Sequence, residues 1–231
     1  MSGSPSFFAP YAEHMAEWWP RLLEAAWVTA ELSALGFAIA LVLGALLVWM
    51  LRSGVAALRH AANGFIQLLR AVPLLALLLA IYFALPSVGI TLSGYWAGAI
   101  GLGVHGAAYV AEILRGGLQS VHGGQREAGL AAGLTPRQVF LSVTLPQALR
   151  VMLPPLLSSY VALLKDSSLC ALIATNELML AARAMSSEYF LPLHIFILVG
   201  LLYFAIAFPL SMLSRWLERR LALGRRTVGA A

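Results

Sequence analysis

Apolar residues in this chain come in long continuous runs rather than in short alternating ones. A helix that crosses the hydrocarbon core of a bilayer needs about 20 mostly apolar residues. Five segments meet that requirement: 27–51, 64–85, 94–114, 151–174 and 190–214. The second carries Arg70 and Pro73 near one end, and the fourth is interrupted by Pro154, Pro155 and the sequence KDSS. The pattern predicts an all-α, polytopic membrane protein with five transmembrane helices.

Composition supports this prediction and excludes a large soluble protein. The chain has 231 residues, of which 61% are hydrophobic and 11% charged, with a mean hydropathy of +0.84. Soluble domains carry about 25% charged residues, so this chain lacks the charge to cover a solvated surface. Its single cysteine, Cys170, excludes an intrachain disulfide and a cysteine-cluster metal site, and we expect it to be a small core residue.

Basic residues are distributed unequally between the two sides that a five-span chain would have. Eleven of the fifteen lysines and arginines fall on one side, and only Arg21 and Arg183 on the other. The eleven are Arg52, Arg59, Arg115, Arg126, Arg137, Arg150, Arg215, Arg219, Arg220, Arg225 and Arg226. Cytoplasmic loops carry an excess of basic residues. We therefore expect an outside N-terminus and a cytoplasmic C-terminus, and the net charge of +5 requires no nucleic acid as a partner.

The segments flanking the spans predict three regions. Residues 1–26 contain YAEHMAEWWPRLLEAAW, which mixes aromatic and charged residues, and we expect an interfacial helix at the outer surface with tryptophans at headgroup depth. Residues 27–217 form the transmembrane domain, and residues 218–231 form a basic cytoplasmic tail.

Motifs of nucleotide-binding and catalytic sites are missing from the sequence. There is no GxxxxGK[ST] loop, HExxH, GxSxG or paired-carboxylate pattern, so we expect neither an enzyme nor a bound cofactor or metal. The one GxGxxG match, GLGVHG at 101–106, lies within an apolar span without a strand before it. Close helix packing at Gly94, Gly98, Gly101 and Ala108 explains it better. His105 in this run is expected to be packed and hydrogen-bonded.

The polar segment QREAGLAAGLTPRQVFLSVTLPQ, residues 125–147, has ordered helix-capping chemistry. Residues 123–132 favour a helix, and Gly133 suits the left-handed position after its end. Thr135 can then be an N-cap, with Pro136 at the first helical position and Gln138 completing a capping box. Unlike an ordinary solvated loop, this helix–turn–helix is expected to dock another protein on the cytoplasmic face.

This segment resembles the EAA loop of ABC-importer permeases, in which E-A-A, three residues, glycine, nine residues and I-x-L-P recur. The matching residues are Glu127, Ala128, Gly133, Leu145 and Pro146. Gly129 replaces the third alanine, and Val143 replaces isoleucine. The segments RAVPLLALLLAIYFALP, AYVAEILRGGLQSV and LPQALRVMLPPLLSSYVALLKDSSL resemble the polar amino-acid branch of that family, which includes histidine and glutamine permeases.

The resemblance implies a type I ABC-importer permease fold and a non-catalytic membrane subunit that imports a polar amino acid or related solute. It implies a second permease subunit, identical or different, an ATPase subunit in two copies, and an extracytoplasmic solute-binding protein in a bacterial inner membrane. Residues 123–147 would be the coupling loop. The candidate ATPase-coupling residues are Arg126, Glu127, Ala128 and Gly133. Two alternatives are a self-contained channel or secondary transporter, and a membrane scaffold.

Ionisable residues inside spans are costly and suggest a wet cavity or a subunit interface. Glu112 and Arg115 are three residues apart on a helix and can pair with each other. Lys165 and Asp166 are adjacent, so their side chains must point to different faces of the helix. Each of them is a candidate for one of two roles: stabilising a gate, or contacting the carboxylate or ammonium group of an amino acid. The candidate pathway residues are Glu112, Lys165, Asp166, Ser167, Asn176 and Glu177. Arg70 is expected near the cytoplasmic end of its span.

Overall fold

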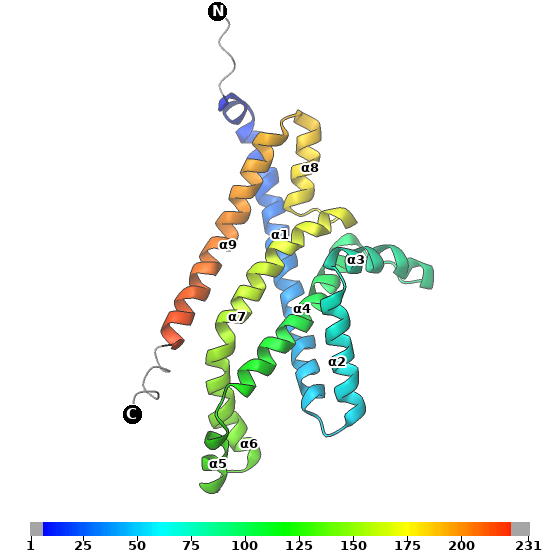
Figure 1. Cartoon of the computed structure of the whole chain (residues 1–231). Helices are drawn as coiled ribbons and strands as arrows, with labels where there is room; N and C mark the ends of the chain where they lie inside the picture. The colour runs from blue at the N-terminus through cyan, green and yellow to red at the C-terminus, as the bar shows by residue number, and fades with distance from the viewer. Residues whose placement is uncertain (1–6, 223–231) are drawn as a thin grey trace, which may run out of the picture.

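The computed structural model describes residues 7–222, and every regular element in that range is helical (Figure 1). The elements are α1 (Ala9–Arg52), α2 (Ala56–Ala71), α3 (Leu74–Leu79), η1 (Ala80–Ala84), η2 (Leu85–Val88), α4 (Gly94–Gln119), α5 (Gly123–Ala131), α6 (Pro136–Val139), η3 (Phe140–Thr144), α7 (Leu145–Asp166), η4 (Ser167–Ile173), α8 (Leu178–Tyr189) and α9 (Pro192–Ala222). Most of the expected basic tail lies beyond Ala222, outside the described residues.

Four stretches are long and apolar enough to cross a membrane: Ala9–Arg52, Gly94–Gln119, Pro136–Ile173 and Pro192–Leu221. A fifth crossing results if α2 and the segment Leu74–Val88 are counted together as one bent span. The all-α membrane fold is therefore confirmed, with four straight candidate spans and one bent pair.

The expected single helix over 64–85 is wrong, because the chain bends by 105° between α2 and α3. Pro73 has no N–H to continue a helix, and it forces the residue before it into an extended conformation. Val72 accordingly has φ −87° and ψ 128°, and α2 ends at Ala71. Because α2 begins at Ala56, Arg70 stands roughly 20 Å along it from the start. Arg70 therefore lies at the end of α2 next to the bend, and its position relative to the cytoplasm stays a prediction.

The two prolines in α7 do not interrupt it, contrary to the expected break. Each proline removes one hydrogen bond of the helix, yet α7 runs unbroken to Asp166. The carbonyl of Pro154 accepts a hydrogen bond from the Ser214 hydroxyl at 2.9 Å, which ties α7 to α9. The change predicted at KDSS does occur, because η4 begins at Ser167 with tighter 3₁₀ geometry.

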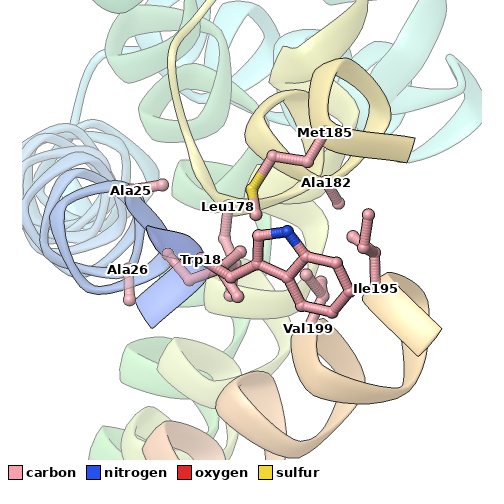
Figure 2. Packing of buried hydrophobic residues seen from close by; sticks show 9 residues of the cluster. Trp18, Ala25, Ala26, Leu178, Ala182, Met185, Ile195 and Val199 are labelled. Carbon is pink, nitrogen blue, oxygen red and sulfur yellow. The ribbon is translucent and has the colours of Figure 1, made fainter. Parts of the chain in front are cut away.

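The N-terminal segment is not a separate surface helix, because α1 continues from Ala9 to Arg52 without a break at residue 26. Trp18 is fully buried, with its indole surrounded by residues of α1, α8 and α9 (Figure 2). Figure 2 labels its neighbours Ala25, Ala26, Leu178, Ala182, Met185, Ile195 and Val199. The indole therefore packs in protein, not in lipid headgroups, whereas Trp27 is 71% exposed.

Small residues of α4 allow the central helices to pack closely, as the sequence predicts. A β-carbon on Gly98 would lie 3.0 Å from Cys170 Sγ, and one on Gly101 would lie 2.6 Å from Leu78 Cδ2. Ala108 is fully buried, and Cys170 is a buried core residue as expected. α4 thus contacts α1, α3 and η4 at short range, which fixes the walls of the sites described below.

The arginine-rich segments share one end of the bundle. α5, α6 and the end of α1 lie toward the bottom of Figure 1 and α9 runs downward to end above them, whereas the start of α1 and α8 lie toward the top. At that upper end the Arg21 guanidinium on α1 pairs with the Glu188 carboxylate on α8 at 2.8 Å. The orientation of the chain in a membrane stays a prediction.

Candidate functional site

The polar segment folds as the sequence predicts. α5 covers Gly123–Ala131, and Gly133 follows it with φ +82°. The Gly133 N–H donates to the Leu130 carbonyl at 3.0 Å and the Leu134 N–H donates to the Gly129 carbonyl at 3.1 Å. These two bonds form a Schellman motif, which satisfies carbonyls at the helix end and requires a left-handed residue at position 133.

A capping box then starts the second helix. The Gln138 N–H donates to Thr135 Oγ1 at 3.3 Å, and the Thr135 N–H donates to Gln138 Oε1 at 2.8 Å, with Pro136 at the start of α6. Local hydrogen bonds therefore define both helix ends, and the helix–turn–helix prediction is confirmed.

Gly129 departs from the family pattern for a reason that the structure makes visible. It is the buried residue of α5, and a β-carbon there would lie 2.9 Å from Val139 Cγ2 on α6. The glycine therefore permits the two helices to approach across the turn. Glycine lowers helix propensity at this position, but it leaves room for Val139 to pack against α5.

One face of α5 remains open to solvent. Arg126, Glu127 and Ala128 are all exposed, and none of them makes an ion pair or side-chain hydrogen bond with another described residue. Leu130 and Phe140 add apolar surface beside them, at 37% and 36% exposure. An exposed carboxylate next to apolar residues on a rigid turn is suited to docking a partner. The role of Arg126, Glu127, Ala128 and Gly133 in such docking stays a prediction.

A cavity of about 470 Å³ opens between α2, α4 and α7. Its lining residues are Arg70, Leu74, Leu102, His105, Gly106, Tyr109, Glu112, Ile113, Ser159, Ala162, Leu163 and Asp166. Its lining combines apolar residues with a guanidinium, an imidazole and two carboxylates that come from α2, α4 and α7. A mostly apolar cleft with a few convergent polar groups is the usual form of a small-solute site.

The charged groups of this cavity are only partly neutralised by one another. Glu112 accepts a hydrogen bond from the Arg115 guanidinium one turn further along α4, so the predicted pair is confirmed. Asp166 makes no ion pair or hydrogen bond within the described part of the chain. The His105 ring lies beside that of Tyr109, with centroids 5.3 Å apart and planes tilted by 47°, and its buried Nδ1 has no hydrogen-bond partner among the described residues. The expected hydrogen bond of His105 is therefore absent at Nδ1.

The adjacent residues Lys165 and Asp166 point to different faces, as predicted, because only Asp166 lines the cavity. Ser167 is buried, and its hydroxyl donates to the Leu164 carbonyl at 2.7 Å. Asn176 is exposed in the connection to α8 and does not line the cavity. For Lys165, Ser167 and Asn176 a role in the pathway stays a prediction.

Glu177 occupies a structural position at the start of α8. Its carboxylate accepts hydrogen bonds from the Met179 N–H at 2.9 Å, the Leu180 N–H at 2.8 Å and the Tyr203 hydroxyl at 2.7 Å. Burial raises the pKa of Glu177, although these three hydrogen bonds lower it in part. The side chain caps α8 and joins it to α9, and the cavity described above does not include it.

Among the cavity residues that the sequence does not supply as candidates, Arg70 and His105 carry a guanidinium and an imidazole. The sequence predicts Arg70 near the cytoplasmic end of a span over 64–85. The buried residues Ala62, Ile66 and Leu69 are spaced as on one face of a helix, and this spacing is the signal that the helix begins before residue 64, at Ala56. His105 was assigned to packing, and its spacing from Tyr109 and Glu112 along one face of α4 is the signal that points to the cavity.

Comparison with known proteins extends the resemblance over nearly the whole chain. Residues 36–223 match the family described as "Binding-protein-dependent transport system inner membrane component". The probable glutamine ABC transporter permease protein GlnP of Bacillus subtilis strain 168 is 36% identical over 220 residues, which covers 93% of this chain and 98% of that protein. The glutamine transport system permease protein GlnP of Escherichia coli K12 is 37% identical, with 88% of this chain and 94% of that protein covered.

Solved structures agree on the fold. A crystal structure of an amino acid ABC transporter with histidines has a chain that is 30% identical, with a TM-score of 0.83, covering 89% of this chain and 96% of that chain. The MetNI methionine ABC transporter in an inward-facing conformation has a TM-score of 0.63 at 24% identity, covering 89% of this chain and 98% of that chain, which shows the shared fold alone. The family does not favour a self-contained channel or secondary transporter. The coupling-loop sequence, the helical membrane fold and these matches agree, and the chain belongs to the family of inner membrane components of binding-protein-dependent ABC importers.

Proposed function

We propose that this permease moves a polar amino acid or a closely related small solute through the cavity between α2, α4 and α7. The observation that carries the proposal is the similarity over nearly the full length to permeases that are described as glutamine transporters. The charge distribution in the cavity supports it independently, because one small space holds groups of both signs.

An amino acid presents a carboxylate and an ammonium group, and each requires a partner when it leaves water. The Arg70 guanidinium suits the carboxylate, and the Asp166 carboxylate, which makes no ion pair or side-chain hydrogen bond within residues 7–222, suits the ammonium group. The Glu112 carboxylate pairs with Arg115 and offers a second acceptor for the ammonium group. Apolar residues such as Leu102 then contact the carbon atoms of the solute.

The energy for import comes, in this proposal, from an ATPase on a separate subunit. The exposed face of α5, with Glu127 at its centre, docks into that subunit, and the Schellman turn at Gly133 transmits its movement to α7. Two permease subunits, two ATPase subunits and an extracytoplasmic binding protein make up the working complex. The permease itself then performs no catalysis and requires no cofactor.

The proposed orientation places the N-terminus outside and the loop 123–147 with the C-terminus in the cytoplasm of a bacterium. It rests on the basic-residue count and on the common end of the bundle that these segments share. Labelling with a membrane-impermeant thiol reagent tests it in intact cells. Ser187→Cys on α8 should react, whereas Ser142→Cys on η3 should react only after the membrane is opened, and the reverse pattern would overturn the orientation.

Transport by the reconstituted complex tests the function. The permease, its ATPase and its binding protein are placed in liposomes, and uptake is measured for a panel of labelled amino acids with and without ATP. We expect uptake of a polar amino acid that requires ATP and both partners. Uptake by the permease alone would instead support a channel or secondary transporter.

Glu127→Ala tests the docking role of the loop. If Glu127 meets a basic side chain in a desolvated contact, truncation costs about 2–5 kcal/mol, mainly because the other charge stays unpaired. The ATPase should then dissociate well over tenfold more readily, since about 1.4 kcal/mol is a factor of ten. Glu218→Ala on the exposed part of α9 is the matched control. Equal ATPase retention by both variants would remove Glu127 from the docking contact.

A further inference from the structure

A second cavity, of about 520 Å³, lies where the end of α1 meets the coupling loop. Its lining residues are Arg52, Leu118, Val121, His122, Gly123, Arg126, Pro136, Arg137, Val139, Phe140 and Thr144. It shares no lining residue with the proposed solute cavity. Two of its lining residues, Arg126 and Phe140, also belong to the candidate docking surface around α5.

Three arginines from three separate elements line this cavity: Arg52 on α1, Arg126 on α5 and Arg137 on α6. Within residues 7–222 none of the three makes an ion pair or a side-chain hydrogen bond. No aspartate or glutamate lines the cavity. Like charges gathered around one space repel one another, so the arrangement favours binding of an anion. Guanidinium groups bind phosphate oxygens in a bidentate manner, which makes phosphate the best-matched anion.

The start of α5 adds to the positive potential. His122 and Gly123 line the cavity, and α5 begins at Gly123. The first N–H groups of a helix lack partners within the helix and carry a partial positive charge. His122 Nδ1 accepts a hydrogen bond from the Gly124 N–H at 3.2 Å, and this contact fixes the imidazole beside the cavity.

The cavity is also lined by apolar residues, which favours a lipid over a free phosphate ion. These residues are Leu118, Val121, Val139 and Phe140, and Phe140 is 36% exposed. Arg52 is the last residue of α1, a helix long and apolar enough to cross a membrane, so in the proposed orientation the cavity lies on the cytoplasmic side of this helix. A phospholipid presents a phosphate and an adjoining apolar body together, whereas inorganic phosphate would leave the apolar residues without a partner.

We propose that this cavity binds the phosphate group of an anionic phospholipid of the cytoplasmic leaflet. The lipid phosphate bridges the end of α1 and the coupling loop by neutralising arginines on both. The proposal rests on the orientation given above, and it adds a lipid as a structural ligand of the coupling loop.

Lipid retention by the purified complex of permease and ATPase provides the test. The complex is titrated in detergent with phosphatidylglycerol or phosphatidylcholine, and bound lipid is counted by native mass spectrometry. Arg52→Gln with Arg137→Gln removes two cavity charges. Arg59→Gln with Arg150→Gln removes two charges from exposed positions that do not line the cavity. At about fivefold per arginine, the cavity variant should bind phosphatidylglycerol about 25-fold more weakly. The control variant and phosphatidylcholine binding should change little.

Three outcomes would overturn the proposal. Equal losses in both double variants would show diffuse attraction to the whole basic surface. Displacement of the lipid by an equal concentration of inorganic phosphate would assign the cavity to free phosphate. Loss of the ATPase with unchanged lipid binding in the cavity variant would assign it to a protein contact. Lipid counting uses neither ATP nor amino acid, so a wrong solute assignment leaves it unaffected, and the thiol labelling reports the orientation separately.

Discussion

Gly129 of α5 and Val139 of α6 are packed so closely that a β-carbon at position 129 would lie 2.9 Å from Val139 Cγ2. Both residues are buried, although the segment around them is exposed. Their contact holds the two short helices of the coupling loop together. The glycine that departs from the family pattern and the valine ten residues later thus belong to one packing unit.

Gly129→Ala should loosen the coupling loop. Overpacking costs about 1–3 kcal/mol, and the better helix propensity of alanine returns about 1 kcal/mol. We expect faster proteolytic cleavage between 123 and 147 and weaker ATPase retention by the purified complex. Adding Val139→Ala should restore both, because the shorter side chain vacates the space. Additive losses in the double variant would contradict direct packing between these positions.

Gly133→Val should misplace the second helix of the loop without changing any charge. Position 133 has φ +82°, which a β-branched residue adopts only with strain of about 1–3 kcal/mol. Gly133→Asn is the matched comparison, since asparagine tolerates the left-handed region. We expect the valine variant to insert normally, but the complex that contains it should hydrolyse ATP without amino-acid uptake. The complex with the asparagine variant should keep most of its uptake per ATP hydrolysed. Full coupling in the valine variant would mean that the turn is free to change its conformation.

Asp166→Asn should reduce uptake far more than it reduces membrane abundance. A hydrogen bond to a charged group contributes about 1.5–3 kcal/mol, so the solute's affinity should fall by about tenfold to a hundredfold. Lys165→Gln removes the neighbouring charge, which faces away from the cavity, and should reduce uptake less than Asp166→Asn does. Uptake and immunoblot signal are measured on the same cells. A larger loss at Lys165 than at Asp166 would remove this cavity from the solute pathway.

Glu177→Gln should flatten the dependence of stability on pH. Burial raises the pKa of Glu177 above its ordinary value of 4.5, so the native state holds a proton more readily than the unfolded state. Stability from this group is fully present below pH 4.5 and is lost as the pH rises through the higher native pKa. We expect the thermal unfolding midpoint to fall between pH 4.5 and pH 7 in the wild type, and less in the variant. Glu218→Gln is the exposed control, and identical slopes in all three proteins would contradict the burial effect.

The coupling loop could be predicted almost residue by residue because its structure is local. The capping box at Thr135 and the left-handed glycine at 133 depend on hydrogen bonds between residues at most five positions apart. The pair of Glu112 and Arg115 was predictable for the same reason. The spacing of residues in the sequence was therefore sufficient to predict the helix ends of this loop and the ion pair.

The cavity between α2, α4 and α7 could be predicted only in part, because it depends on where separate helices meet. Arg70 lines the cavity because α2 ends just before Pro73, where the chain bends by 105°. The length of α1 was also hidden, because the polar residues before 27 suggested a surface helix. Burial of Trp18 against Leu178 and Ile195 is a contact across more than 150 positions, and no local pattern predicts it.

The uninterrupted α1 has a mechanical consequence for signalling across the membrane. From Trp18 to Arg52 it rises about 51 Å, roughly 1.7 times the thickness of the hydrocarbon core. Arg52 lies beside the coupling loop, and Trp18 packs against α8 and α9. A tilt of about 5° displaces one of these two positions relative to the other by about 4 Å. The same helix can therefore act as a lever that converts a small angular change at the coupling loop into a displacement at the opposite surface.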